Sequence, residues 1–139
     1  MAIHLRKASP RPRRGAATVE LALILPIFLL LCVGMIEFGR AFMVQQTLTS
    51  AAREGARFGA LPGTSNNEIE TRVREFLAAG GVDPTVAQVD VSPQGLETAS
   101  SGEQVRVLVE VAYQDVSWLA APWYLRDADL SNETVMRRE

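Results

Sequence analysis

One carboxylate near the amino terminus stands where a charged group is costly. Glu20 directly precedes the uncharged run LALILPIFLLLCVGMI, which extends from Leu21 to Ile36. An ionised acid inside a bilayer costs about 2.5–3.5 kcal/mol on insertion scales, so its presence needs a compensating group. A cut between Gly15 and Ala16 would supply one, because the freed amine of Ala16 would lie one helical turn before Glu20. In an assembly, Glu20 would then neutralise the amine of an adjacent subunit.

Both residues also have simpler interpretations. Gly15 would then be only a helix breaker. Glu20 would be an acid near a helix N-terminus, where the helix dipole favours negative charge without any partner subunit. We favour the cut, because it explains the basic leader, the glycine and the acid together.

Other reactive groups are too few to build a catalytic centre. Cys32 is the only cysteine and His4 the only histidine, so no intrachain disulfide can form. Neither residue lies after the apolar run, which excludes thiol–imidazole pairs and histidine zinc sites there. Asp127 and Asp129 are two positions apart but lack the further ligands of a calcium loop. We therefore expect no enzyme, no metal or other cofactor, and no small-molecule substrate.

Charge is distributed unevenly along the 139 residues. Residues 1–15 hold five of the 14 basic residues and no acid, which leaves 9 basic against 16 acidic residues in the remainder. A short basic leader before an acidic remainder indicates a sorting signal and argues against nucleic-acid binding. The positive-inside rule places the amino terminus in the cytoplasm and everything after residue 40 outside.

The apolar run is a candidate membrane helix. At about 1.5 Å per residue, Leu21–Ile36 covers roughly 24 Å, and its neighbours extend it to the ~30 Å core of a lipid bilayer. A secretory signal peptide is the rival, but no small-x-small cleavage site closes the run, so we expect the helix to be retained. Glu37 and Arg40, one turn apart, are expected to form an ion pair at the outer membrane surface.

Three motifs in close order carry a family resemblance. RRGAATVELALILP, IEFGR and TSAAREGARFGA resemble the TadE-like family, the pseudopilin-like proteins of Tad (Flp) pilus systems. The resemblance covers about residues 13–60, and the chain end is similar more weakly. It implies cleavage after Gly15 by prepilin peptidase, with Glu20 as the acid five residues after the cut. The mature protein would be a minor pilin or pseudopilin.

The resemblance also implies a location and partners. The chain would be a single-pass protein of the bacterial inner membrane, working in pilus assembly with other Tad or Flp pilins and assembly proteins. The alternative is an uncleaved single-span protein that carries an extracytoplasmic binding module.

Beyond the membrane run, residues 42–60 continue as a helical stem. Small residues recur at intervals of four and form two stripes, Ala51, Gly55 and Gly59 on one and Ala52, Ala56 and Ala60 on the next. Such stripes let helix backbones approach closely. They would pack either against other subunits or against the chain's own domain, and the sequence leaves both open.

The remaining residues predict a small α+β domain of one short helix on about three antiparallel strands. Ser65 and Glu68 form a capping box before an apolar helix face. Strands are predicted at 86–91, 105–114 and 130–137, the second from its strict alternation. The predicted organisation is therefore a leader at 1–15, a helix and stem at 16–60, and a domain at 61–139. We expect the aromatic residues of the last loop to pack in the core rather than at a membrane or partner surface: Trp118, Trp123 and Tyr124.

Overall fold

A long helix opens the structure. The computed structural model describes residues 14–98, 100–118 and 128–138. Helix α1 (Arg14–Gly59) has 46 residues and continues through Pro26 in its interior. The chain divides into two compact units, Met1–Met35 and Ile36–Glu139, so the second part of α1 belongs to the folded domain.

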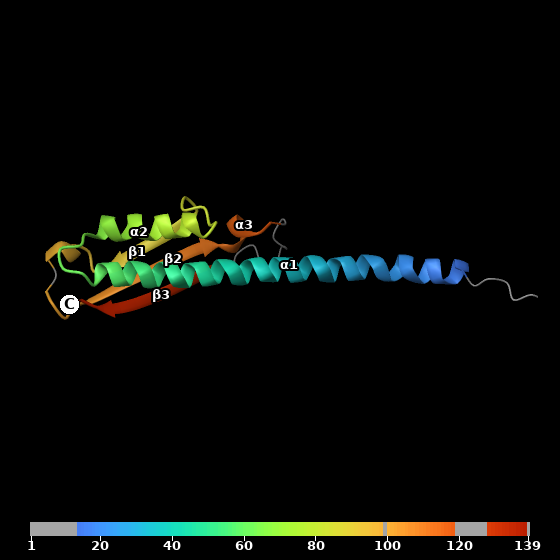
Figure 1. The fold of residues 1–139 in the computed structure, drawn as a ribbon, viewed down its shortest axis with the longest axis horizontal. Helices are drawn as coiled ribbons and strands as arrows, with labels where there is room; N and C mark the ends of the chain where they lie inside the picture. Colours follow the sequence, from blue (N-terminus) through green and yellow to red (C-terminus); the bar gives the residue numbers. More distant parts are fainter. Residues whose placement is uncertain (1–13, 99, 119–127, 139) are drawn as a thin grey trace, which may run out of the picture. The chain divides into compact units, whose positions relative to one another are not determined.

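The second unit is an α+β domain, as the sequence predicts (Figure 1). Its strands form one antiparallel sheet in the order β1-β2-β3, with β2 in the centre. After α1, the elements are α2 (Asn66–Ala79), β1 (Ala87–Ser92), a short 3-10 helix (Leu96–Thr98), β2 (Gln104–Ala112), α3 (Tyr113–Val116) and β3 (Asp129–Arg137).

Local sequence signals explain where α2 begins and which face it buries. The Ser65 side chain accepts from the backbone N–H of Glu68, and the Glu68 carboxylate accepts from the backbone N–H of Ser65, which completes the predicted capping box. Ile69, Val73 and Leu77, spaced by four, are fully buried.

The core lies between the two long helices and one face of the sheet, and α1 and α2 run side by side over that face (Figure 1). Every second residue of β2 is buried there because side chains alternate across a strand. These are Val105, Val107, Val109 and Val111. From α1, Val44 and Leu48 are fully buried, so the stem is itself a core element of the domain.

The second predicted strand is wrong at its end. Strand β2 stops at Ala112, and Tyr113 begins the four-residue helix α3 instead. The backbone N–H of Tyr113 donates to the carbonyl of Ala128 at 2.9 Å, a contact between residues that are remote in sequence. Alternation alone could not reveal this bend.

Two side chains lie in environments that the sequence did not predict. Leu96, in the predicted loop, is fully buried, and its backbone N–H donates to the Asn66 side chain at 3.1 Å. Trp118 is exposed rather than packed in the core, so the prediction for this residue is wrong. Trp123, Tyr124 and Asp127 lie outside the described residues.

Candidate functional site

The predicted cleavage segment lies in the first turns of α1. Gly15, Ala16 and Glu20 are all exposed, and Ala16 and Glu20 are separated by one helical turn. A Cβ placed on Gly15 would meet no atom within 4 Å. Steric crowding by the described residues therefore does not require glycine at position 15.

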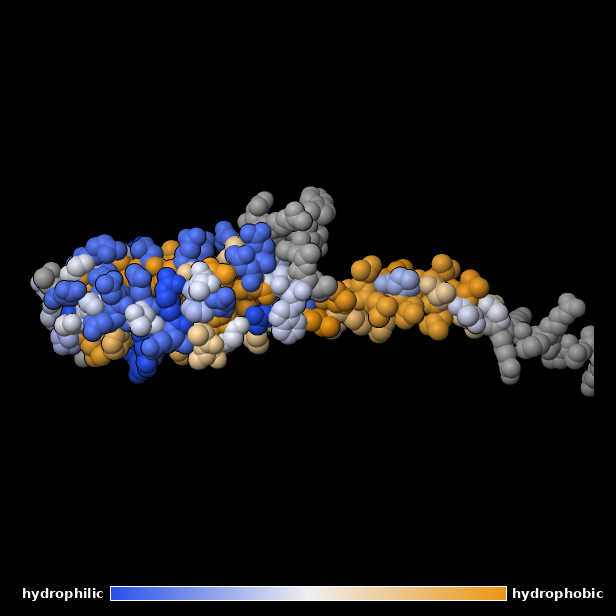
Figure 2. Space-filling model, turned by 90° about the horizontal axis from the view of Figure 1, so that it is seen from above, coloured by the Kyte–Doolittle hydropathy of each residue, from blue (hydrophilic) through white to orange (hydrophobic). Residues whose placement is uncertain are grey.

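Between Glu20 and Glu37, α1 carries no charged side chain on any side. Among the described residues, one helix, Gly15–Gly59, is long and apolar enough to cross a membrane. Its large hydrophobic side chains from Val19 to Ile36 are mostly exposed, and Figure 2 shows them as an almost unbroken hydrophobic surface. Such a helix is compatible with a single-pass membrane protein.

The small residues of the stem face the chain's own domain. A Cβ on Gly55 would lie 2.4 Å from Cγ2 of Val73 in α2, and one on Gly59 would lie 2.8 Å from Cδ1 of Ile69. Ala51, Ala52 and Ala56 are fully buried, while Ala60 is half-buried. Of the two alternatives for these stripes, packing within the chain is the one observed.

A polar cluster forms where α1 enters the domain. The Glu37 carboxylate accepts hydrogen bonds from the hydroxyls of Tyr113 at 3.1 Å and Ser117 at 2.8 Å. The Arg40 guanidinium donates through Nε to the carbonyl of Val116 at 3.2 Å and through Nη2 to that of Gly81 at 3.3 Å.

The expected ion pair between Glu37 and Arg40 is thus wrong for the part of the chain that the structure describes. Each side chain instead contacts α3 or the residues around it. The sequence did signal the position, because two charges follow an apolar run. It could not identify partners that lie 76 to 80 residues further along the chain.

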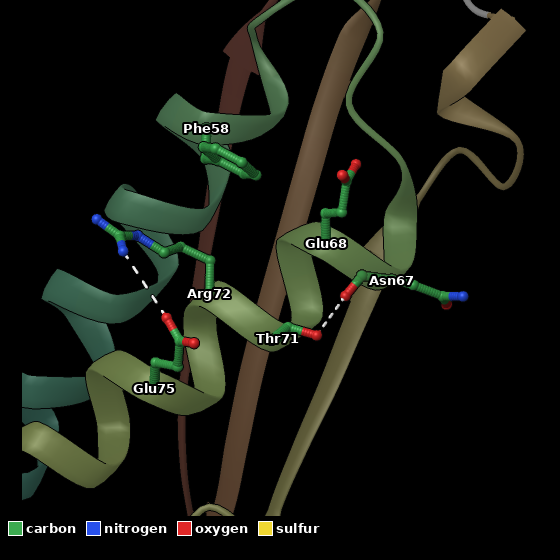
Figure 3. Close-up of a pocket in the computed structure, with 6 residues that line it drawn as sticks. All are labelled: Phe58, Asn67, Glu68, Thr71, Arg72 and Glu75. Atoms are coloured by element: carbon green, nitrogen blue, oxygen red, sulfur yellow. Dashed lines mark hydrogen bonds and ion pairs between the residues drawn. The ribbon is translucent and has the colours of Figure 1, made fainter.

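A shallow groove of about 380 Å³ lies between the ends of α1 and α2, and Figure 3 shows its lining. Several of its polar groups are engaged with one another or with residues beside the groove. Arg72 forms ion pairs with Glu54 at 3.3 Å and Glu75 at 3.7 Å, and the Thr71 hydroxyl donates to the carbonyl of Asn67 at 2.8 Å. These contacts stabilise the helices, and none of them presents a reactive group.

Together these features define a class of protein, one in which a single long apolar helix is joined to a small α+β domain. One apolar helix, suited to a membrane, runs on into a small α+β domain and supplies part of its core. Residues 15–57 match the family model described as TadE-like protein, and this confirms the resemblance carried by the three motifs. The match suggests a membrane protein associated with a Tad pilus, and it implies association with other pilus components. Neither the curated proteins nor the solved structures gave a match to this chain.

Proposed function

We propose that this chain is a prepilin-like structural subunit for assembly of a Tad-type pilus, and that prepilin peptidase removes its leader after Gly15. The observation that carries the proposal is the TadE-like match, which begins at Gly15 and covers the following helix. An exposed Glu20 in an otherwise apolar segment supports it, because the freed amine of Ala16 would compensate that charge in an assembly.

In this proposal the protein is not an enzyme. It is anchored in the bacterial inner membrane by α1, with the leader in the cytoplasm and the domain outside. The charge pattern supports this orientation, since the basic residues of the leader precede the apolar run. Its partners would be prepilin peptidase, the lipid bilayer and other pilins and assembly proteins of the same system.

The experiment is an intact-mass measurement of protein extracted from membranes of cells that contain an active prepilin peptidase. We expect a mass that lacks residues 1–15 and an amino-terminal sequence that begins at Ala16. The variant Gly15→Ala should accumulate as precursor. Since a methyl group at position 15 meets no atom of the described residues within 4 Å, any loss of processing would report recognition rather than misfolding.

Gly39→Ala is the matched control, because its Cβ also meets nothing within 4 Å and it lies far from the proposed cut. It should be processed like the unaltered chain. Full-length mass in the unaltered chain would overturn the proposed cleavage and favour the uncleaved, tethered binding module.

A further inference from the structure

The most exposed hydrophobic side chains of the second unit are aromatic and lie at one end of it. Among its described residues, Phe38 is 75%, Trp118 71% and Phe42 60% exposed. Phe38 and Phe42 belong to the first turns of α1 in this unit. Trp118 follows α3 but lies beside the same turns, because the Arg40 guanidinium is 5.4 Å from the centre of its ring.

Trp118 is held in place although its ring is exposed. The two residues before Trp118 form hydrogen bonds with α1. The Ser117 hydroxyl donates to the Glu37 carboxylate, and the Arg40 guanidinium donates to the carbonyl of Val116. The ring itself stacks near Arg40 at cation–π distance. An exposed tryptophan ring that is held in place in this way is positioned to meet a surface outside the domain.

The aromatic residues lie on two sides of α1 rather than in a patch on one side. Phe38 and Phe42 are four residues apart and share a face. Arg40, whose guanidinium contacts the Trp118 ring, is two positions from each of them. At ~100° per residue it therefore lies about 200° around the helix from both. A partner helix or sheet would cover one side only, whereas a lipid layer surrounds a helix completely.

We propose that Phe38, Phe42 and Trp118, here named the aromatic collar, seat the domain directly in the interfacial layer of the lipid bilayer. The inference rests on the proposed membrane anchoring. The collar directly continues the apolar run that ends at Ile36. At about 1.5 Å per residue, Phe38 and Phe42 lie roughly 3 and 9 Å beyond it, a depth that matches the headgroup region where aromatic rings are enriched.

The polar cluster fits the same location. Glu37 and Arg40 stand at the boundary of the apolar run, where a charge without partners would be poorly solvated. Two hydroxyls satisfy the carboxylate, and two carbonyls satisfy the guanidinium. The domain therefore supplies the hydrogen bonds that water would supply elsewhere, and no free stem separates it from the membrane.

Tryptophan fluorescence in lipid vesicles tests the collar. The chain has two tryptophans, so Trp123→Phe leaves Trp118 as the sole reporter. The protein would be reconstituted into phosphatidylcholine vesicles with bromine atoms placed either near the glycerol or deep in the acyl chains. We expect blue-shifted emission and several-fold stronger quenching by shallow than by deep bromines.

The matched control moves the reporter to the other end of the domain, with Leu61→Trp in a chain that carries Trp118→Phe and Trp123→Phe. Leu61 is an exposed hydrophobic residue just after α1, and its tryptophan should stay unquenched. If the protein floats with the vesicles but Trp118 is not quenched, the aromatic collar is overturned and the membrane anchoring is not. This holds whether the emission wavelength of Trp118 indicates water or a neighbouring protein around the ring. Failure of the protein to float with vesicles would overturn the membrane anchoring as well.

Discussion

The hydroxyl of Ser117 donates a hydrogen bond of 2.8 Å to the carboxylate of Glu37, although 80 residues separate them in the chain. This contact ties the turn after α3 to the point where α1 enters the domain. The Tyr113 hydroxyl donates to the same carboxylate oxygen, Oε2. Polar contacts therefore join α1 to α3 and the residue after it where the helix enters the domain, and close apolar packing holds the last turns of α1 against α2 and β2.

Removal of the Glu37 carboxylate should loosen the domain. Glu37→Ala takes away an acceptor that two hydroxyls share, and we expect a loss of about 1–3 kcal/mol in the free energy of unfolding. Glu37→Gln keeps one acceptor oxygen and should lose less. Urea unfolding of the full chain in detergent micelles measures both.

Glu133→Gln is the control for that measurement. Glu133 pairs with Arg106 at 3.3 Å, but both side chains are largely exposed, so we expect a change below about 0.5 kcal/mol. Equal losses for Glu37→Ala and Glu133→Gln would contradict a structural role for the contact between Ser117 and Glu37.

The glycines of the stem should not tolerate a methyl group. Gly55→Ala would bring a Cβ to 2.4 Å from Val73, and Gly59→Ala would bring one to within 3 Å of Ile69 and Val105. We expect each to destabilise the domain by about 1–3 kcal/mol because the well-packed core must shift.

Gly39→Ala serves as the matched helix control for these two variants. Its added Cβ meets no atom within 4 Å, so the higher helix propensity of alanine should stabilise the chain by about 0.5–1 kcal/mol. Thermal unfolding followed by circular dichroism compares the three. A stabilised Gly55→Ala variant would show that α1 does not pack on α2 in this way.

Glu20 should matter for assembly and not for folding or processing. In Glu20→Gln the uncharged amide cannot balance a freed amine, so we expect normal cleavage and membrane insertion but a loss of pili. Pilus yield by electron microscopy and precursor-to-mature ratio by immunoblot measure the two effects separately. Glu70→Gln in α2 is the control. Normal piliation of the Glu20→Gln strain would remove the proposed role of this carboxylate.

The capping box predicts how stability depends on pH. Hydrogen bonds from the backbone and side chain of Ser65 lower the pKa of Glu68 from its ordinary value of 4.5. A lowered pKa in the folded state means that the carboxylate stabilises the domain above pH 4.5. This contribution should disappear as the pH falls through the lowered value.

Glu68→Gln should therefore weaken the loss of stability on acidification in that range. Unfolding midpoints between neutral pH and pH 3 measure the slope for both chains. Asp83, whose pKa is also lowered, by bonds from Thr85, remains in the variant and should keep part of the slope. An unchanged slope in Glu68→Gln would show that the cap does not contribute.

The sequence by itself determined the features that arise from neighbouring residues. The uncharged run from Leu21 to Ile36 fixed the apolar helix, because together with its neighbours it is long and apolar enough for a membrane span. Ser65 and Glu68 fixed the start of α2, since a capping box joins residues three apart. The alternation of valines from Val105 to Val111 fixed the central strand and its buried face.

Only the tertiary structure decided which distant groups meet. The small residues from Ala51 to Gly59 were compatible with a partner subunit until Val73 and Val107 were found against them. Glu37 and Arg40 suggested an ion pair by their spacing, yet α3 offered each of them other partners. Spacing along a helix specifies which residues share a face. Which later segment of the chain packs against that face is decided by the tertiary fold.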